Sequence, residues 1–242
     1  MLFGSVHLIL LGLTALSAAL TVWGAPRLSR PEAVFRVSGW VLLASSVFYT
    51  VWLLLPPNFS LGDSLPLHFS DALRFTCAVA LIMGARWAAA IAYYWGLTLN
   101  SQALLTPHPS MLEGLSVNMV FYWALHIAVL LVPLALLRTD YRPRWRDFGV
   151  AYGGAAAWTA LTMPINHVLG TNYGFLNRPP DGGSLIDLLG PWPLYVMWLA
   201  VLVAAVWAVM TWPWTRRAAR QDYDEQDVSA SLDALRRGRK RL

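Results

Sequence analysis

The chain places possible acid–base and nucleophilic groups inside apolar segments. The segment "LPLHFSD" contains His68, Ser70 and Asp71, and His126 lies within a later apolar segment. A histidine can act as a general base, a serine hydroxyl can act as a nucleophile, and a carboxylate can orient the histidine. These residue types predict acid–base or nucleophilic chemistry, with catalytic candidates His126, His68, Asp71 and Ser70.

Helix geometry limits which of these groups can meet. Ser70 follows His68 by two residues, roughly 200° around a helix, so the two side chains diverge and His126 becomes the expected base for Ser70. Alternatively, His68 and His126 act as acid and base without a protein nucleophile. A metal site of His68, His126 and Asp187 has no recognised ligand spacing, and we expect neither a metal nor another cofactor.

Further polar residues lie at or near the same end of the apolar segments. An unpaired ionisable group facing lipid is costly, so such groups are expected to face a polar cavity or one another. We predict that one set lines a cavity and binds substrate: His7, Asn100, Gln102, Asn166, Asn172, Arg178 and Asp187. The alternative for any one of them is a buried polar network that holds helices together.

Residues 162–193 form a polar, proline-rich interruption between two apolar segments. Arg178 offers a clamp for a phosphate, and nearby amide and carboxylate groups offer hydrogen bonds to a lipid head group. The alternative is that the prolines end helices and the aromatic residues anchor the chain at the membrane interface. We expect a re-entrant or packed loop that forms the outer wall of the cavity, with Asn172 and Asp187 in structural rather than catalytic roles.

Long apolar segments must position these groups. The chain has 57% hydrophobic residues and 13 tryptophans, a composition typical of a membrane protein. About 20 apolar residues are needed for a helix to cross roughly 30 Å of hydrocarbon. We predict an all-α, seven-span membrane domain within residues 1–215, with spans at residues 4–24, 37–56, 66–85, 87–105, 118–137, 148–169 and 191–214.

The arginines predict the orientation of these spans. Outside the predicted spans, the arginines follow the first, third, fifth and seventh spans. Arg178 is the only arginine in the connections that follow the second, fourth and sixth spans. Basic residues in short loops stay in the cytoplasm, so we expect the N-terminus outside, the C-terminus in the cytoplasm and all five histidines towards the outside. The first span has its arginines after it, which favours a retained helix over a cleaved signal peptide.

The composition and motifs narrow the possible functions. The net charge of +5 is concentrated in the predicted cytoplasmic loops and in a charged cytoplasmic tail at residues 216–242, which favours contact with anionic lipid and not nucleic-acid binding. The single cysteine, Cys77, rules out an intramolecular disulfide and a metal-binding cysteine cluster. P-loop, GxSxG, HExxH and Rossmann patterns are missing from the sequence.

A family resemblance covers nearly the whole chain before the tail. The order "LPLHFSD", "YYWGLTLNSQALLTP", a histidine in the following span, "INHVLGTNYGFLNRPP" and "SLIDLLGPWPLY" resembles the YwaF-like bacterial integral membrane proteins. This family is in turn distantly similar to a eukaryotic transmembrane acyltransferase acting on ether phospholipids and to the androgen-induced hydrolases of fatty-acid esters. The resemblance implies a multi-pass protein of the bacterial plasma membrane, with a nucleophile region from His68 to Asp71 and an active histidine at His126.

The chain departs from that pattern at the nucleophile. The acyltransferase has a cysteine and the hydrolases have a threonine, whereas this segment contains Leu67, His68, Phe69 and Ser70. Two function classes follow. One is an enzyme that transfers or hydrolyses lipid acyl groups in the outer half of the membrane, with a membrane lipid or acyl-lipid as substrate. The other is a non-enzymatic transporter or binding protein for a small polar or lipid ligand. The sequence does not indicate an oligomeric state.

Overall fold

The computed structural model describes residues 2–139, 141–180 and 185–239, with side chains described up to residue 216 except at 185, and all regular secondary structure within these residues is helical. Residues 181–184 of the polar interruption and 240–242 of the predicted tail lie outside these ranges. The main helices are α1 (Ser5–Gly24), α2 (Pro31–Leu54), α3 (Phe69–Met83), α4 (Arg86–Leu97), α5 (Leu99–Leu105), α6 (Val117–Arg138), α7 (Trp145–Leu169) and α8 (Leu194–Arg239). Short 3-10 helices occupy Ala25–Arg27, Pro109–Leu112, Tyr173–Phe175 and Leu185–Leu189.

Four helices within the described residues are long and apolar enough to cross a membrane. They comprise Ser5–Arg27, Pro31–Leu54, Val117–Arg138 and Leu194–Arg216. Large apolar side chains on α1, α2 and α8 are exposed, including Ile9, Val37 and Val201. Exposed apolar surface of this extent is what lipid covers in a membrane protein. The chain is therefore a multi-pass membrane protein.

The third and fourth predicted spans have a different form from the other five. Helix α3 has 15 residues, or about 22 Å at 1.5 Å per residue, less than the hydrocarbon thickness. The fourth predicted span is divided at Thr98 into α4 and α5. The number of complete membrane crossings, seven, therefore remains a prediction. The same holds for the side of the membrane on which each end of the chain lies.

Two helix boundaries differ from the predicted spans for local reasons. Helix α2 begins at Pro31, six residues before the predicted span, with Glu32 in its first turn. Proline is favoured at the first helical position, and an acidic side chain there interacts well with the helix dipole. Helix α8 continues past the predicted span to Arg239, where the sequence is rich in arginine and alanine, both strong helix formers.

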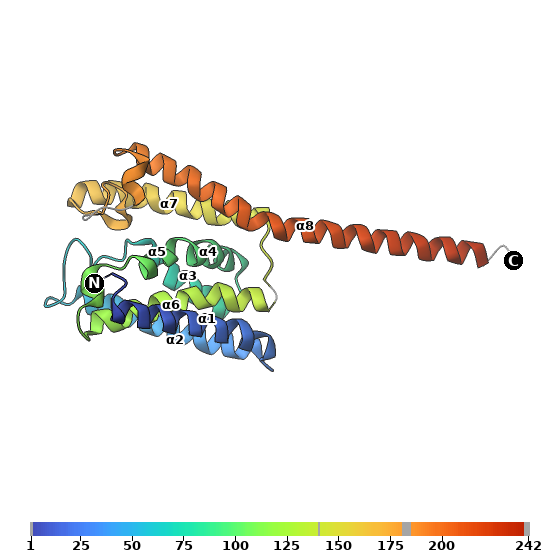
Figure 1. Cartoon of the computed structure of the whole chain (residues 1–242), viewed down its shortest axis with the longest axis horizontal. Coiled ribbons are helices and arrows are strands. Elements are labelled where there is room, and N and C mark those ends of the chain that lie inside the picture. The colour runs from blue at the N-terminus through green and yellow to red at the C-terminus, as the bar shows by residue number, and fades with distance from the viewer. Residues whose placement is uncertain (1, 140, 181–184, 240–242) are drawn as a thin grey trace.

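The chain runs back and forth between two ends of a bundle (Figure 1). Helices α1 and α2 lie beside α6, while α7 contacts α4 and α8 contacts α7. One end, called here the loop end, carries the connections at residues 55–68, 106–116, 170–180 and 185–193. The connections at residues 25–30, 84–85 and 141–144 lie at the opposite end, beyond which α8 extends (Figure 1).

Helix α4 lies at the centre of the bundle. Most of its side chains are buried, including those of Tyr94 and Trp95. Gly96 lets α4 approach α6 closely, because a Cβ at this position would lie 3.1 Å from the carbonyl oxygen of Val129. At the end away from the loops, Arg86 binds Asp147 of α7 through Nη2–Oδ2 at 2.6 Å and Nε–Oδ1 at 3.0 Å. This pair joins the starts of α4 and α7.

Candidate functional site

The start of α3 is organised by Asp71. Its Oδ2 accepts a hydrogen bond from the backbone N–H of His68 at 2.9 Å, and its Oδ1 forms an ion pair with Arg74 Nη1 at 2.9 Å. Asp71 is a buried residue. The carboxylate therefore caps the helix and balances the charge of an arginine, and among the described residues it binds the His68 backbone and Arg74 rather than a histidine ring.

Arg74 is a buried cation held at two of its nitrogens. Besides the Asp71 contact, Nη2 donates to Thr50 Oγ1 of α2 at 2.8 Å. The guanidinium lies 5.7 Å from the ring centroid of Tyr49, within cation–π range. A buried charge is stable only when it is paired and hydrogen-bonded, and these contacts meet that requirement for most of the group.

Asn100 follows the break between α4 and α5. The break at Thr98 is fixed by two hydrogen bonds of its hydroxyl, which donates to Tyr94 O at 2.5 Å and accepts from Trp207 Nε1 at 3.0 Å. Asn100 Nδ2 then donates to the backbone carbonyl oxygen of His126 at 2.9 Å. Because a carbonyl can only accept, this bond also fixes which end of the amide is nitrogen. Irregular backbone of this kind is tolerated in a membrane where protein buries it.

His126 has one ring nitrogen committed to its own helix. Nδ1 lies 2.7 Å from the carbonyl oxygen of Tyr122, and since that oxygen can only accept, Nδ1 carries the proton. In the neutral imidazole the other nitrogen, Nε2, then has a lone pair. The Tyr122 ring contacts the imidazole at a centroid distance of 4.1 Å, with the two planes tilted by 36°. His126 is thus a fixed ring whose free nitrogen has the form of a general base.

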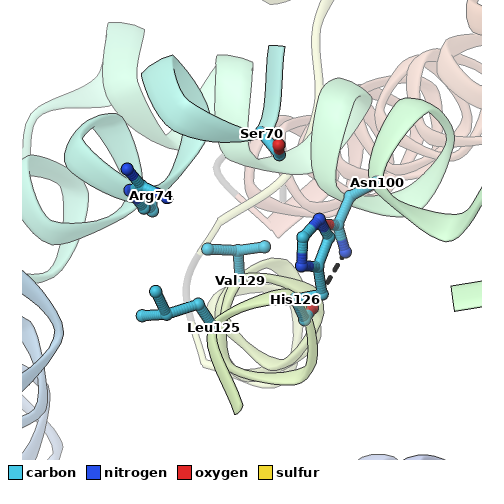
Figure 2. A pocket seen from close by; sticks show the side chains of 6 residues that line it. All are labelled: Ser70, Arg74, Asn100, Leu125, His126 and Val129. Carbon is cyan, nitrogen blue, oxygen red and sulfur yellow. Dashed lines mark hydrogen bonds between the residues drawn. The ribbon is translucent and has the colours of Figure 1, made fainter. Parts of the chain in front are cut away.

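These groups line one small pocket (Figure 2). Ser70 and Arg74 enter it from α3, Asn100 from α5, and Leu125, His126 and Val129 from α6. The cavity volume is about 10 Å³, about the least space that holds one water molecule, whereas ligand pockets commonly hold roughly 300–1,000 Å³. The side chains around the pocket must therefore move apart before it can admit a reacting group.

Two of the pocket's polar atoms have no protein partner. Among the described residues, Arg74 Nε and Asn100 Oδ1 are buried without a hydrogen bond, as are hydroxyl oxygens of Tyr141 and Thr162 elsewhere. Leaving a buried polar atom unpaired costs about 1–3 kcal/mol. The residues that line the pocket therefore contain one unused donor and one unused acceptor.

The other two membrane-embedded histidine candidates lie outside this pocket. His68 precedes α3, where its Nδ1 accepts from the backbone N–H of Gly174 at 3.3 Å and its ring contacts Tyr173 edge-on at 4.9 Å. Both nitrogens of buried His7 are bonded to backbone: Nδ1 accepts from Phe3 N–H at 3.0 Å, and Nε2 donates to Leu104 O at 2.9 Å. His7 therefore joins the start of α1 to α5 and has no ring nitrogen left for a ligand.

The polar interruption after α7 is a packed loop built on Asn166. Its Oδ1 accepts from Thr171 Oγ1 at 2.9 Å and from Tyr173 N–H at 2.8 Å, and its Nδ2 donates to Tyr173 O at 3.0 Å. The Tyr173 hydroxyl donates to Leu61 O at 2.7 Å and accepts from Leu65 N–H at 3.0 Å. The loop therefore packs against residues 55–68 over the start of α3. Its described residues do not line the pocket.

The remaining candidates also lie away from the pocket. Asn172 Oδ1 accepts from the backbone N–H groups of Asn177 and Arg178 at 3.2 and 3.1 Å, which closes a turn. Three other candidates are exposed, namely Gln102, Arg178 and Asp187. The described residues contain no group of three His, Cys, Asp or Glu side chains suited to a metal ion, so His68, His126 and Asp187 are not gathered into one.

Sequence reasoning omitted Arg74 from the site. Its signal was present, because Arg74 is a single arginine inside an apolar segment and lies three residues after Asp71, on the same helix face. The apolar lining by Leu125 and Val129 follows from their positions beside and one turn beyond His126 on α6. What could not be read from spacing is that α3, α5 and α6 meet there.

Comparison with known proteins places the chain in a family. A family model described as TMEM164 family matches residues 2–211, which include every helix that lines the pocket. No curated protein and no solved structure matches the chain. The match supports a transmembrane protein family and does not test the narrower resemblance to YwaF-like proteins or to the two enzyme groups. On this match, the chain belongs to the TMEM164 family.

Proposed function

We propose that this protein is a membrane-embedded enzyme that transfers or hydrolyses a lipid acyl ester, with Ser70 as nucleophile and His126 as general base. The observation that carries the proposal is that both side chains line one pocket while His126 keeps Nε2 free. The alternative pairing of His68 with His126 has less support, because His68 contacts Tyr173 and Gly174 instead.

The position of Ser70 in α3 favours a reactive hydroxyl. Serine and threonine hydroxyls inside a helix commonly donate to the carbonyl four residues earlier, as Thr76 does to Ala72 O at 2.7 Å. Ser70 is the second residue of α3, so no helical carbonyl precedes it by four residues. Its hydroxyl can instead be directed towards the pocket.

The reaction follows from these roles. Ser70 Oγ attacks the ester carbonyl carbon, His126 Nε2 takes the hydroxyl proton, and the C–O bond to the first lipid breaks as that proton passes to the leaving oxygen. The hydroxyl of a second lipid, or water, then attacks the acyl-serine. His126 takes the new proton and returns it to Ser70. Attack by the lipid hydroxyl gives acyl transfer, and attack by water gives hydrolysis.

The apolar lining of the pocket supports a lipid substrate. The cavity of about 10 Å³ must widen to admit an ester group and is far too small for its chains, and the apolar side chains of Leu125 and Val129 lie beside the reacting groups. His126 is only partly buried. The acyl chain is therefore expected to remain in the surrounding lipid while its ester enters the pocket, in the half of the bundle towards the loop end.

The test is turnover by purified protein in phosphatidylcholine vesicles that contain a lysophospholipid and an isotopically labelled acyl chain. Wild-type protein should move the label to the lysophospholipid or release it as fatty acid. Ser70→Ala and His126→Ala should each lose that activity while remaining folded, since acid–base catalysis typically contributes about 10²–10⁴-fold.

His7→Ala is the matched control, because His7 is a histidine bonded only to backbone groups. It should lower thermal stability and retain turnover per folded molecule. Activity in Ser70→Ala with none in His126→Ala would exclude an acyl-serine and favour direct transfer between lipids. Lipid binding without any turnover by the wild type would replace the enzyme with a carrier or binding protein.

A further inference from the structure

Arg74 and Asn100 both line the pocket that contains Ser70 and His126, and each has one polar atom of opposite hydrogen-bonding type without a partner among the described residues. Arg74 is 6% exposed and Asn100 is 2% exposed, and both line the pocket (Figure 2). Within the described residues, neither Arg74 Nε nor Asn100 Oδ1 has a partner. Nε–H is a donor on a cation, whereas Oδ1 is an acceptor, so only Arg74 can stabilise a negative oxygen.

We propose that Arg74 is the oxyanion-binding residue of this site, and this assignment rests on the proposed function. Its Nε–H would donate to the carbonyl oxygen of the ester and bind that oxygen more strongly when attack by Ser70 makes it negative. A donor fixed in place before the reaction stabilises such a charge without having to reorganise. Asp71 and Thr50 act as positioning residues, because they hold Nη1 and Nη2 of the same guanidinium.

The charge balance of the pocket favours a neutral ester over an ionised fatty acid. Asp71 offsets the charge of Arg74 before the reaction, so a neutral ester adds no net charge to a buried site. When the oxyanion forms, His126 has taken the serine proton, and the new negative charge is matched by a new positive one. An ionised carboxylate would add an unmatched charge, which is costly away from water.

The test uses a dodecyl fluorophosphonate as a probe of Ser70 in the full-length protein. Ser70 Oγ attacks phosphorus, the P–F bond breaks, fluoride leaves, and the hydroxyl proton passes to His126. The phosphoryl oxygen then occupies the position of the oxyanion. The rate of Ser70 modification is measured by mass spectrometry, so the natural substrate need not be known.

Arg74→Lys is the informative variant, since it keeps the positive charge beside Asp71 but lacks the Nε–H of the guanidinium. Loss of one oxyanion donor typically slows a reaction by about 10²–10³-fold, and we expect a fall of that size in the modification rate. Arg86→Lys is the matched control, because Arg86 pairs with Asp147 near the other end of the bundle. It should leave the modification rate unchanged.

The outcomes separate this assignment from the function on which it rests. A wild-type rate in folded Arg74→Lys, with modification lost in His126→Ala, overturns the role of Arg74 alone. Absence of Ser70 modification in the wild type overturns both proposals. If Arg74→Lys does not fold, the double variant Asp71→Asn with Arg74→Met removes both charges together. Slow modification of that folded variant supports the assignment, and a wild-type rate overturns it.

Discussion

Asn100 of α5 donates a 2.9 Å hydrogen bond from its side-chain amide to the backbone carbonyl oxygen of His126 in α6. The bond joins the irregular part of the fourth predicted span to the helix that carries the proposed base. It also means that the position of His126 depends on a residue 26 positions earlier in the chain.

Asn100→Ala should lower the free energy of unfolding by about 1–3 kcal/mol, because it removes a buried hydrogen bond and leaves the His126 carbonyl without this partner. The measurement is chemical unfolding in detergent, followed by tryptophan fluorescence. Gln102→Ala is the control, since Gln102 is an exposed residue of the same short helix. Equal stability of Asn100→Ala and wild type would show that the bond contributes little.

A second prediction concerns the close approach of α2 to α3. A Cβ at Gly39 would lie 2.7 Å from Ile82 Cγ1 and 2.9 Å from Leu81 Cβ, so the two helices must move apart to accept it. Gly39→Ala should destabilise the protein by about 1–3 kcal/mol. Because α2 carries Thr50, the same change should also slow modification of Ser70 by the fluorophosphonate.

Gly12→Ala provides the control for this substitution. Gly12 is also inside a helix, but a Cβ there would meet nothing within 4 Å. Alanine should therefore leave stability unchanged or raise it by up to about 1 kcal/mol. Equal effects of the two substitutions in unfolding measurements would contradict the helix contact at Gly39.

The sequence predicted the long helices well and the interrupted ones less well. Helices α1 and α6 lie within one or two residues of their predicted spans, because long apolar segments between polar connections define them locally. The break at Thr98 was not predicted. At the break, the Thr98 hydroxyl accepts a hydrogen bond from Trp207, 109 residues later in the chain, and no local pattern contains that contact.

The candidate site was predictable to a similar degree. Depth in the membrane and residue type selected Asn100 and His126, the family resemblance pointed to the region that contains Ser70, and the structure brings all three to one pocket. The same reasoning also selected Asn166, whose amide instead builds the loop after α7. Depth alone cannot separate these cases, because a buried amide is equally stable when it binds a loop backbone and when it faces a cavity.

A third prediction concerns pH. Burial raises the pKa of the Tyr173 hydroxyl in the loop after α7. Since the neutral form is favoured in the folded state, the stabilisation is complete below the unfolded pKa of about 10 and is lost as the pH rises through the folded value. The thermal midpoint should therefore fall between pH 9 and pH 11, and part of that fall should be missing in Tyr173→Phe.

Tyr173→Phe should also be less stable than wild type at pH 8, because it loses the hydrogen bonds to Leu61 O and Leu65 N–H. Tyr152→Phe is a suitable control, as its hydroxyl makes one exposed contact to Ala200 O. An identical pH dependence of Tyr173→Phe and wild type would contradict the assigned role of the Tyr173 hydroxyl.

The last prediction concerns the orientation of the bundle, which decides the half of the membrane that contains the pocket. Cys77 is the only cysteine and is fully buried, so a Cys77→Ala protein provides a background for single cysteines. Ser110 at the loop end and Ser29 at the opposite end are both exposed. From the arginine distribution, Ser110→Cys should react with an impermeant maleimide in intact cells, and Ser29→Cys should react only after permeabilisation. Reaction at position 29 but not at position 110 would reverse the orientation. His126 lies towards the loop end of α6, so that result would move the proposed ester chemistry to the cytoplasmic half of the membrane while leaving the pocket itself unchanged.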